Sequence, residues 1–203
     1  MSENIERIIF INLDKRTDRF EQINDEFKRF NLEDKAERFP AIYHPSGTVG
    51  CGRSHLAVLK LAKERKYKNI LILEDDFHFI VSKDDFEYNL KLFFENVKEY
   101  DVCLFSYNLN KAESCEFSFL FKLLDCQTAS GYLVNQNYYD TLINLYEKAI
   151  PLLESTGQHW IYANDQIWKQ LQAIDNWYCF KTRLGKQKAG FSDNSQTYVD
   201  YNC

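Results

Sequence analysis

Three adjacent carboxylates, Glu74, Asp75 and Asp76, are the residues of this sequence whose types and spacing most directly suggest chemistry. They follow the apolar run 69–73 (NILIL), which ends abruptly at Glu74. Neighbouring carboxylates repel one another unless a positive charge compensates them. Mg²⁺ and Mn²⁺ prefer oxygen ligands and are often held by one or two carboxylates together with substrate phosphates. The triplet therefore predicts a divalent-cation site, with a solvated acidic turn as the alternative.

The position of the triplet in the fold follows from the pattern of apolar residues along the chain. Short apolar runs predict strands over 7–13, 38–42, 69–73, 101–106, 128–135 and 177–182. Apolar residues at helical spacing predict helices over 17–30, 54–65, 84–99, 137–149 and 164–173. This alternation predicts an α/β fold with a mostly parallel central sheet. Ligands of such sheets bind beyond the carboxyl ends of the strands, where the triplet lies.

Glycine is concentrated in one short stretch, 43–53, which contains Gly47, Gly50 and Gly52. Three of the seven glycines thus lie within six residues, which predicts a specialised loop. His55 follows this stretch and is the best functional candidate among the four histidines, although each of the four can equally be structural. No two histidines are spaced as a metal pair on a helix.

Several common site types are excluded by their missing motifs. A phospho-receiver domain carries its acidic pair in the first strand and needs an aspartate at a later strand end. Here two predicted helices precede the triplet, and the strand over 101–106 ends in Ser106. The sequence has no G-x₄-G-K-[ST] phosphate loop and no G-x-S-x-G nucleophile elbow, and Gly50-Cys51-Gly52 lacks the third glycine of a dinucleotide fingerprint.

Length and composition indicate one domain, 1–203, that needs no disulfide or metal to fold. The formal net charge of −5 argues against a nucleic-acid partner. The first residues are acidic where a signal peptide is basic, and no apolar run approaches the roughly 18 residues of a membrane span. The six cysteines contain no close pair, so we expect reduced thiols rather than a zinc site, and a cytoplasmic protein.

Four segments carry a more specific pattern: 9–19 (IFINLDKRTDR), 50–56 (GCGRSHL), 71–76 (LILEDD) and 131–134 (GYLV). In order and spacing they resemble the "NLxxRxDR", "GCxxSH", "ILEDD" and "AYL" elements of glycosyltransferase family 25. This family comprises lipopolysaccharide galactosyltransferases and collagen galactosyltransferase-like proteins. The tail, 185–201, is similar to the C-terminal segment of collagen-type members, including those of giant viruses. The chain is short for the family and corresponds to a bare catalytic domain, with 183–203 as a tail near the active site.

The resemblance implies a GT-A fold, a nucleotide-sugar-binding α/β/α sandwich that usually works with Mn²⁺ (or Mg²⁺) and inverts the anomeric centre. Asp76 would hold the metal, and Glu74 would share it or face the ribose. Arg19 would be a site residue or a structural ion pair. The residues expected to meet the nucleotide sugar are Asn12, Asp14, Arg16, Gly50, Ser54, His55, Glu74, Asp75, Lys186, Ser192 and Asp193.

An inverting transferase requires a general base that takes the proton of the acceptor hydroxyl. We expect Asp165, at the start of the helix over 164–173, to be this base. The alternative is that Asp165 only provides a favourable charge at a helix N-terminus. Asp193 is the second candidate base, and either it or His159 could instead complete the metal site.

The resemblance thus predicts transfer of a hexose, galactose or glucose, from a UDP-sugar to a hydroxyl acceptor on a glycan or on a hydroxylysine-type protein side chain. The alternative is a catalytically inactive module that binds a sugar nucleotide or a glycan. A viral member would act in the host cytoplasm or the virion. The donor sugar, the acceptor and the oligomeric state stay open.

Overall fold

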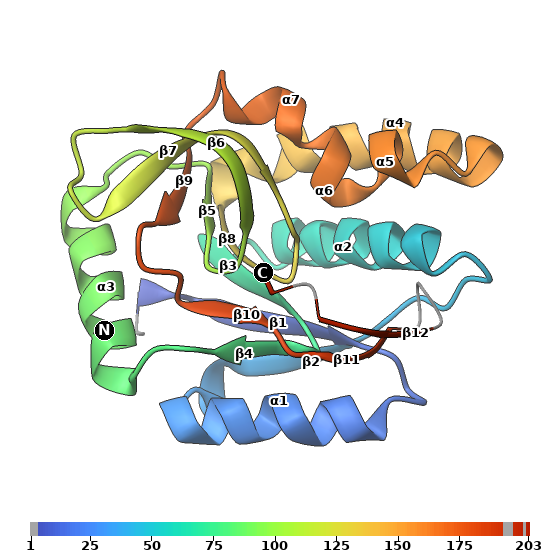
Figure 1. The fold of residues 1–203 in the computed structure, drawn as a ribbon, viewed down its shortest axis with the longest axis horizontal. Helices are drawn as coiled ribbons and strands as arrows, with labels where there is room; N and C mark the ends of the chain where they lie inside the picture. Colours follow the sequence, from blue (N-terminus) through green and yellow to red (C-terminus); the bar gives the residue numbers. More distant parts are fainter. Residues whose placement is uncertain (1–3, 193–196, 201) are drawn as a thin grey trace.

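The computed structural model describes residues 4–192, 197–200 and 202–203, which are organised around one eight-stranded sheet (Figure 1). In spatial order its strands are β2 (Ala36–Pro40), β1 (Arg7–Asn12), β3 (Asn69–Glu74), β8 (Gly131–Asn135), β5 (Val102–Leu104), β9 (Trp177–Phe180), β7 (Leu120–Gln127) and β6 (Asn108–Ser114). Two small antiparallel sheets pair β4 (Phe77–Phe79) with β10 (Gly185–Gln187) and β11 (Gly190–Ser192) with β12 (Thr197–Val199).

Helices cover both faces of the large sheet (Figure 1). They are α1 (Thr17–Phe30), α2 (Gly47–Glu64), α3 (Lys83–Asn96), α4 (Tyr139–Thr156), α5 (His159–Tyr162), α6 (Asn164–Ile167) and α7 (Lys169–Gln172), with the 3₁₀ helices η2 (Glu33–Lys35) and η3 (Gln136–Tyr138). In the described part of the chain, no helix is long and apolar enough to cross a membrane. All six cysteines are unpaired, and four of them are buried.

The predicted α/β architecture is confirmed, but the central sheet is mixed rather than mostly parallel. Strand β1 is parallel to β2 and β3, and β5 is parallel to β9. Strand β8 is antiparallel to β3 and β5, and β7 is antiparallel to β9 and β6. The reason lies between β5 and β8, where a β-hairpin stands in place of the helix that a parallel crossover requires.

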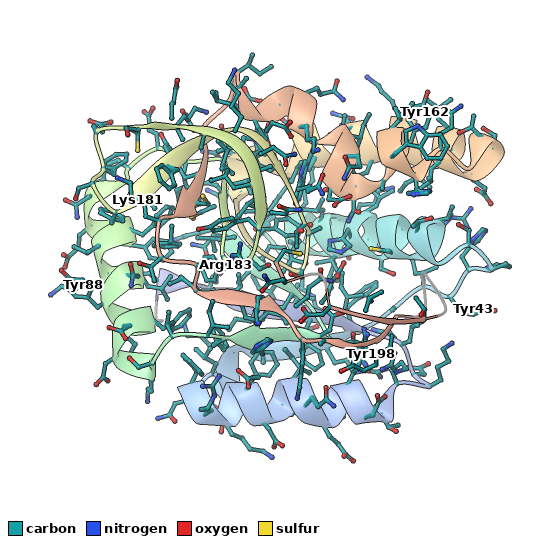
Figure 2. All side chains as sticks on the ribbon, in the orientation of Figure 1. Tyr43, Tyr88, Tyr162, Lys181, Arg183 and Tyr198 are labelled. Atoms are coloured by element: carbon teal, nitrogen blue, oxygen red, sulfur yellow. The ribbon has the colours of Figure 1, made fainter. Side chains whose placement is uncertain are left out.

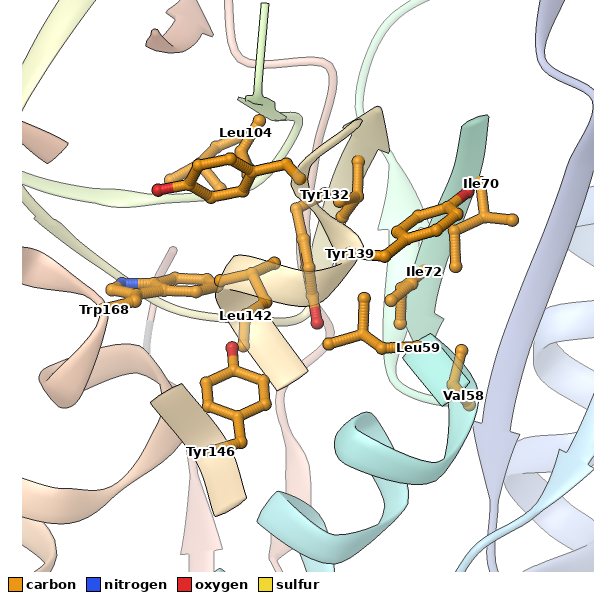
Figure 3. Close-up of a cluster of buried hydrophobic side chains, with 14 of the residues drawn as sticks. Val58, Leu59, Ile70, Ile72, Leu104, Tyr132, Tyr139, Leu142, Tyr146 and Trp168 are labelled. Atoms are coloured by element: carbon orange, nitrogen blue, oxygen red, sulfur yellow. The ribbon is translucent and has the colours of Figure 1, made fainter. Parts of the chain in front are cut away.

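Two apolar layers, one on each face of the sheet, hold the helices in place. On one face, Val58 and Leu59 of α2 and Leu142 of α4 pack against Ile72 of β3 and Tyr132 of β8 (Figure 3). The other face is covered by α1 and α3, whose inward residues are mostly phenylalanine: Phe27, Phe30, Phe86 and Phe93. Because both faces are covered, β1 and β3 are buried along nearly their whole length, as their continuous apolar runs predicted.

The parallel centre of the sheet brings two strand ends together. In the register of β1 with β3, Ile11 lies opposite Glu74. Asn12, the last residue of β1, therefore lies at the edge of the sheet from which the acidic triplet emerges. This edge is the place predicted for a ligand site.

The glycine-rich stretch is helical, so the prediction of a loop over 43–53 is wrong beyond residue 46. Helix α2 begins at Gly47 and contains all three of these glycines. A Cβ atom on Gly50 would lie 2.6 Å from the carbonyl oxygen of Ile42 and 3.3 Å from the Cβ of His44. The Ser54 hydroxyl also joins residue 42 to the helix. It donates to the Gly50 carbonyl and accepts from the Ile42 N–H, both at 2.8 Å. Glycine here permits close packing of a helix against the strand-to-helix connection.

We expect Gly50→Ala to lower the free energy of unfolding by about 1–3 kcal/mol, because the new methyl group would meet a backbone carbonyl that cannot move aside. Gly52→Ala is the matched control in the same helix. A Cβ there would lie 3.4 Å from the flexible side chain of Ile150, an ordinary contact, and alanine favours the helix. Urea denaturation of both variants checks the prediction, and equal stability of the two would contradict it.

Candidate active site

A cavity of about 460 Å³ opens where the carboxyl ends of β1 and β3 face the first turns of α2 and α6. Its lining also includes Tyr43, which is 71% exposed and is labelled in Figure 2, together with Gln187 and Cys203 from the C-terminal part of the chain. The predicted site residues that line the cavity are Arg16, Gly50, Ser54, His55, Glu74, Asp75, Asp76 and Asp165. Residues from both ends of the sequence thus share one site.

Asp75, the middle residue of the acidic triplet, is held by hydrogen bonds from two side chains. The Asn12 amide nitrogen donates to its Oδ2 at 2.7 Å, and Arg19 Nη1 donates to its Oδ1 at 2.9 Å. The Asn12 side-chain oxygen accepts in turn from Arg38 Nε at 2.9 Å. These contacts fix the backbone that presents Glu74 and Asp76.

Glu74 divides its two oxygens between different partners. Its Oε1 lies 3.2 Å from His55 Nε2 and accepts from the Cys51 thiol at 3.4 Å. Its Oε2 accepts from the Gln187 amide nitrogen at 3.4 Å. His55 is fully buried, and its Nδ1 lies 2.8 Å from the Tyr132 hydroxyl. His55 therefore links Glu74 to the buried Tyr132 and holds the Glu74 carboxylate in position.

Asp76 faces the same point in the cavity as Glu74 Oε2. Its Oδ1 accepts from Gln187 Nε2 at 3.5 Å, and its Oδ2 accepts from Arg19 Nη1 at 3.1 Å. Because Glu74 and Asp76 share one donor atom, an oxygen of each lies close to a common point. Two carboxylate oxygens around one point are a donor set that Mg²⁺ or Mn²⁺ accepts.

Burial and mutual repulsion shape the charges of the triplet. Burial raises the pKa of Asp76 to about 7, and the charge of Glu74 adds to this rise against the opposing charge of Arg19. Burial likewise raises the pKa of Asp75. Burial is the largest influence on Glu74 and works to raise its pKa, but the contacts with His55, the hydrogen bond from Cys51 and the charge of Arg19 together outweigh burial and lower that pKa. Without a cation, the Asp76 carboxyl is therefore protonated in part of the molecules at neutral pH.

We expect Asp76→Asn to make the metal-free protein more stable than the wild type, by an amount that grows as the pH rises. The pKa of Asp76 is about 7 in the folded protein, against an ordinary value of 3.8. The folded state therefore binds this proton more tightly, and the associated stability is present below about pH 4 and lost as the pH rises through about 7. Asparagine cannot ionise, so the variant should gain on the order of a few kcal/mol over the wild type between pH 4 and pH 8.

Urea denaturation in the presence of a chelator, at several values between pH 4 and pH 8, measures this gain. Asp25→Asn, which removes an exposed carboxylate on α1, is the control and should show no such trend. A stability difference between Asp76→Asn and the wild type that stays constant with pH would contradict the prediction.

Asp165 lies at the start of α6 and lines the cavity from the helical side. Its Oδ2 accepts from the backbone N–H of Thr128 at 3.1 Å, and burial raises its pKa. Thr128 has φ of +88°, a conformation that is strained for a β-branched residue, and strained residues of this kind cluster at functional sites. The chain thus bears strain at the residue that orients Asp165.

Other predicted residues lie away from the cavity or support it. Asp14 is exposed and pairs with Arg38 at 2.6 Å. His159 is exposed on α5, and neither it nor Lys186, opposite His78 in the β10–β4 pair, is among the described lining residues. The backbone of Ser192 belongs to β11, and Asp193 lies outside the described residues.

The sequence predicted that the tail 183–203 lies near the active site, but it did not single out the residues that this tail brings there, Gln187 and Cys203. Gln187 reaches Glu74 and Asp76 because β10 pairs with β4, the short strand after the triplet. Cys203 is buried and accepts from the Thr128 hydroxyl at 3.2 Å. No local pattern marks either residue, because each contact joins positions far apart in the chain. Thr128 was predicted as the first residue of the strand 128–135, but that strand begins only at Gly131.

Two solved structures have folds similar to that of this chain. The first is a glycosyltransferase involved in the glycosylation of the major capsid of PBCV-1, with 10% identity, a TM-score of 0.53, and coverage of 94% of this chain and 95% of that chain. The second is the mannose-1-phosphate geranyltransferase of Thermus thermophilus, with 8% identity, a TM-score of 0.51, and coverage of 89% and 74%. No protein-family model matches the chain, and no curated protein is similar to it in sequence.

These comparisons establish similarity of fold and nothing finer, because the identities are low. The chain has an α/β fold with a mixed, partly parallel central sheet that resembles glycosyltransferase structures of the GT-A kind. The predicted fold class is confirmed.

Proposed function

We propose that this protein is an inverting, metal-dependent glycosyltransferase of the family 25 type. It would transfer a hexose, galactose or glucose, from a UDP-sugar to a hydroxyl group of a glycan or of a protein side chain. The observation that carries the proposal is the cavity itself. Within a glycosyltransferase-like fold, it joins two convergent carboxylates, Glu74 and Asp76, to a third, Asp165, on a different wall.

Glu74 and Asp76 would hold Mn²⁺ or Mg²⁺ through Oε2 and Oδ1, the oxygens that now share the Gln187 amide. The metal would supply Lewis-acid stabilisation of the charge that develops on the departing diphosphate. Arg16 and Lys15 line the same cavity and would place positive charge near the uridine and its phosphates. The Gln187 side chain would have to turn away when a cation binds.

The contacts that Asn12, Ser54 and His55 make within the protein also support the proposal. Asn12 holds Asp75, Ser54 ties α2 to the connection before it, and His55 holds Glu74. Each therefore positions the donor site, and Arg16 stays the predicted contact of the nucleotide.

Asp165 would act as the general base. The acceptor oxygen attacks the anomeric carbon, the bond from that carbon to the diphosphate oxygen breaks, and the hydroxyl proton passes to the Asp165 carboxylate. The products are the glycoside and UDP. Burial raises the pKa of Asp165, which brings its proton affinity closer to that needed near neutral pH.

A panel of UDP-sugars tests the proposal, with release of UDP measured with and without Mn²⁺ and with simple glycan and hydroxylysine acceptors. We expect UDP-galactose or UDP-glucose to be turned over only when the metal is present. Binding of UDP without turnover of any donor would favour the inactive binding module instead. Absence of both would contradict the proposal as a whole.

A further inference from the structure

A second cluster of metal-ligating side chains shares Glu74 with the acidic triplet. Its members are Cys51 and His55, both on α2, and Glu74 at the end of β3. One ligand atom from each lies within 4.8 Å of the other two. Sγ of Cys51 is 3.4 Å and Nε2 of His55 is 3.2 Å from the same oxygen, Glu74 Oε1. The three donors are a thiol, an imidazole and a carboxylate, unlike the all-oxygen set at Asp76.

Two of the three separations between the donor atoms agree with the edges of a tetrahedral zinc site. With Zn–S of about 2.3 Å and Zn–N and Zn–O of about 2.0 Å, the edges of a tetrahedron are about 3.5 Å for S···O and about 3.3 Å for N···O. The separations of 3.4 and 3.2 Å match these edges. The third separation, between Cys51 Sγ and His55 Nε2, is within 4.8 Å, so the three donors are near enough to close around one cation.

We propose that Cys51, His55 and Glu74 form a binding site for Zn²⁺, separate from the oxygen-ligand site. Thiolate and imidazole ligands favour zinc over magnesium and manganese. Zn²⁺ would displace the thiol proton, so that one thiolate, one carboxylate and the ion form a neutral group. Cys51, His55 and Glu74 all line the cavity, and we expect water or a bound molecule to take the fourth position of the ion.

The surroundings of the histidine fit this role. Metal-binding histidines almost always use their second ring nitrogen in a hydrogen bond that fixes the ring. His55 Nδ1 lies 2.8 Å from the Tyr132 hydroxyl, and the ring itself is fully buried. The other ring nitrogen, Nε2, faces Glu74 and is therefore the one that would bind the ion.

Glu74 allows both sites to exist in one protein. Its Oε1 belongs to the Cys51–His55 side, and its Oε2 faces Gln187 and Asp76. Single substitutions can therefore separate the two sites: Cys51→Ser removes a ligand of the zinc site alone, and Asp76→Asn removes a ligand of the oxygen site alone.

Titration of the metal-free protein with Co²⁺, without any nucleotide, tests the proposal. Co²⁺ replaces Zn²⁺ in such sites, and thiolate ligation produces a near-ultraviolet charge-transfer band. We expect one equivalent of Co²⁺ to give this band together with the visible bands of four-coordinate cobalt, and one equivalent of Zn²⁺ to abolish both. Cys51→Ser should lose the charge-transfer band and weaken Zn²⁺ binding by about tenfold or more, whereas Asp76→Asn should keep the band.

Cys203→Ser is the matched control, because Cys203 is the other cysteine that lines the described cavity. It should keep the band. Thermal unfolding of each variant without metal establishes that it is folded. Absence of a thiolate band in the wild type, or a band that survives in Cys51→Ser, would overturn the proposal. The proposed transferase activity could fail without affecting this result, because the titration contains no donor.

Discussion

Replacing Asp165 with asparagine is expected to reduce hexose transfer by about 10²–10⁴-fold while UDP binding is retained. The asparagine oxygen can still accept from the Thr128 N–H, as Asp165 Oδ2 does at 3.1 Å, so the side chain should keep its position. What the variant loses is the ability to take a proton from the acceptor hydroxyl. The measurement is the initial rate of glycoside formation at saturating donor, with UDP affinity determined in parallel by titration calorimetry.

Asp140→Asn separates catalysis from the helix-charge alternative. Asp140 is an exposed carboxylate in the first turn of α4, as Asp165 is in the first turn of α6. If Asp165 only stabilises a helix terminus, the two variants should behave alike, each losing under about 1 kcal/mol of stability and little activity. Full transfer activity in Asp165→Asn would exclude it as the base.

Asp76→Asn is expected to remove most of the metal-dependent turnover, by about 10²–10³-fold at a fixed Mn²⁺ concentration. The variant keeps the shape of the side chain but loses one of the two negative charges around the point now filled by the Gln187 amide. Its folded state should be at least as stable as that of the wild type above pH 7, because the buried charge is gone. Loss of activity would then reflect chemistry rather than unfolding.

Initial rates over a range of Mn²⁺ concentrations measure this effect. The variant should need much more Mn²⁺ for half-maximal rate, or show no dependence on it. Asp25→Asn, remote from the cavity on the exposed side of α1, should match the wild type. Unchanged Mn²⁺ dependence in Asp76→Asn would show that the metal binds elsewhere.

The parts of the fold that could be predicted are those with strong local signals. Helix α1 has the predicted bounds, 17–30, because Ile23, Phe27 and Phe30 repeat at helical spacing against one face of the sheet. Strand β3 was predicted from its uninterrupted apolar run. A strand needs such a run when both faces of its sheet are covered, because all its side chains are then buried. The hairpin β6–β7 gave no such signal, since most side chains of β6 are exposed.

The sequence indicated the parts of the candidate site that depend on one strand or helix end, but not the contacts that depend on long-range packing. The triplet and Asp165 line the cavity as expected from their places at element ends. His55 and Ser54, which were predicted to meet the donor, line the cavity, and they also contact Glu74 and the Ile42 backbone, which the sequence did not predict. Gln187 could not be found, because only the long-range pairing of β10 with β4 brings it to Glu74.

Arg19 explains why three carboxylates can stay together without a metal. Its guanidinium bridges Asp75 and Asp76 at 2.9 and 3.1 Å, so one positive charge compensates part of the triplet within the protein itself. The structural ion pair that the sequence left as an alternative is therefore present. The remaining charge, on Glu74 and Asp76, is the part that faces Gln187 and the cavity.

The binding of UDP, measured by isothermal titration calorimetry with Mn²⁺ and again with a chelator, tests the central claim most directly. We predict one UDP site per chain that requires Mn²⁺ and is lost in Asp76→Asn. UDP binding that is equal with Mn²⁺ and with chelator, or no binding under either condition, would contradict a metal-dependent nucleotide-sugar site at this edge of the sheet.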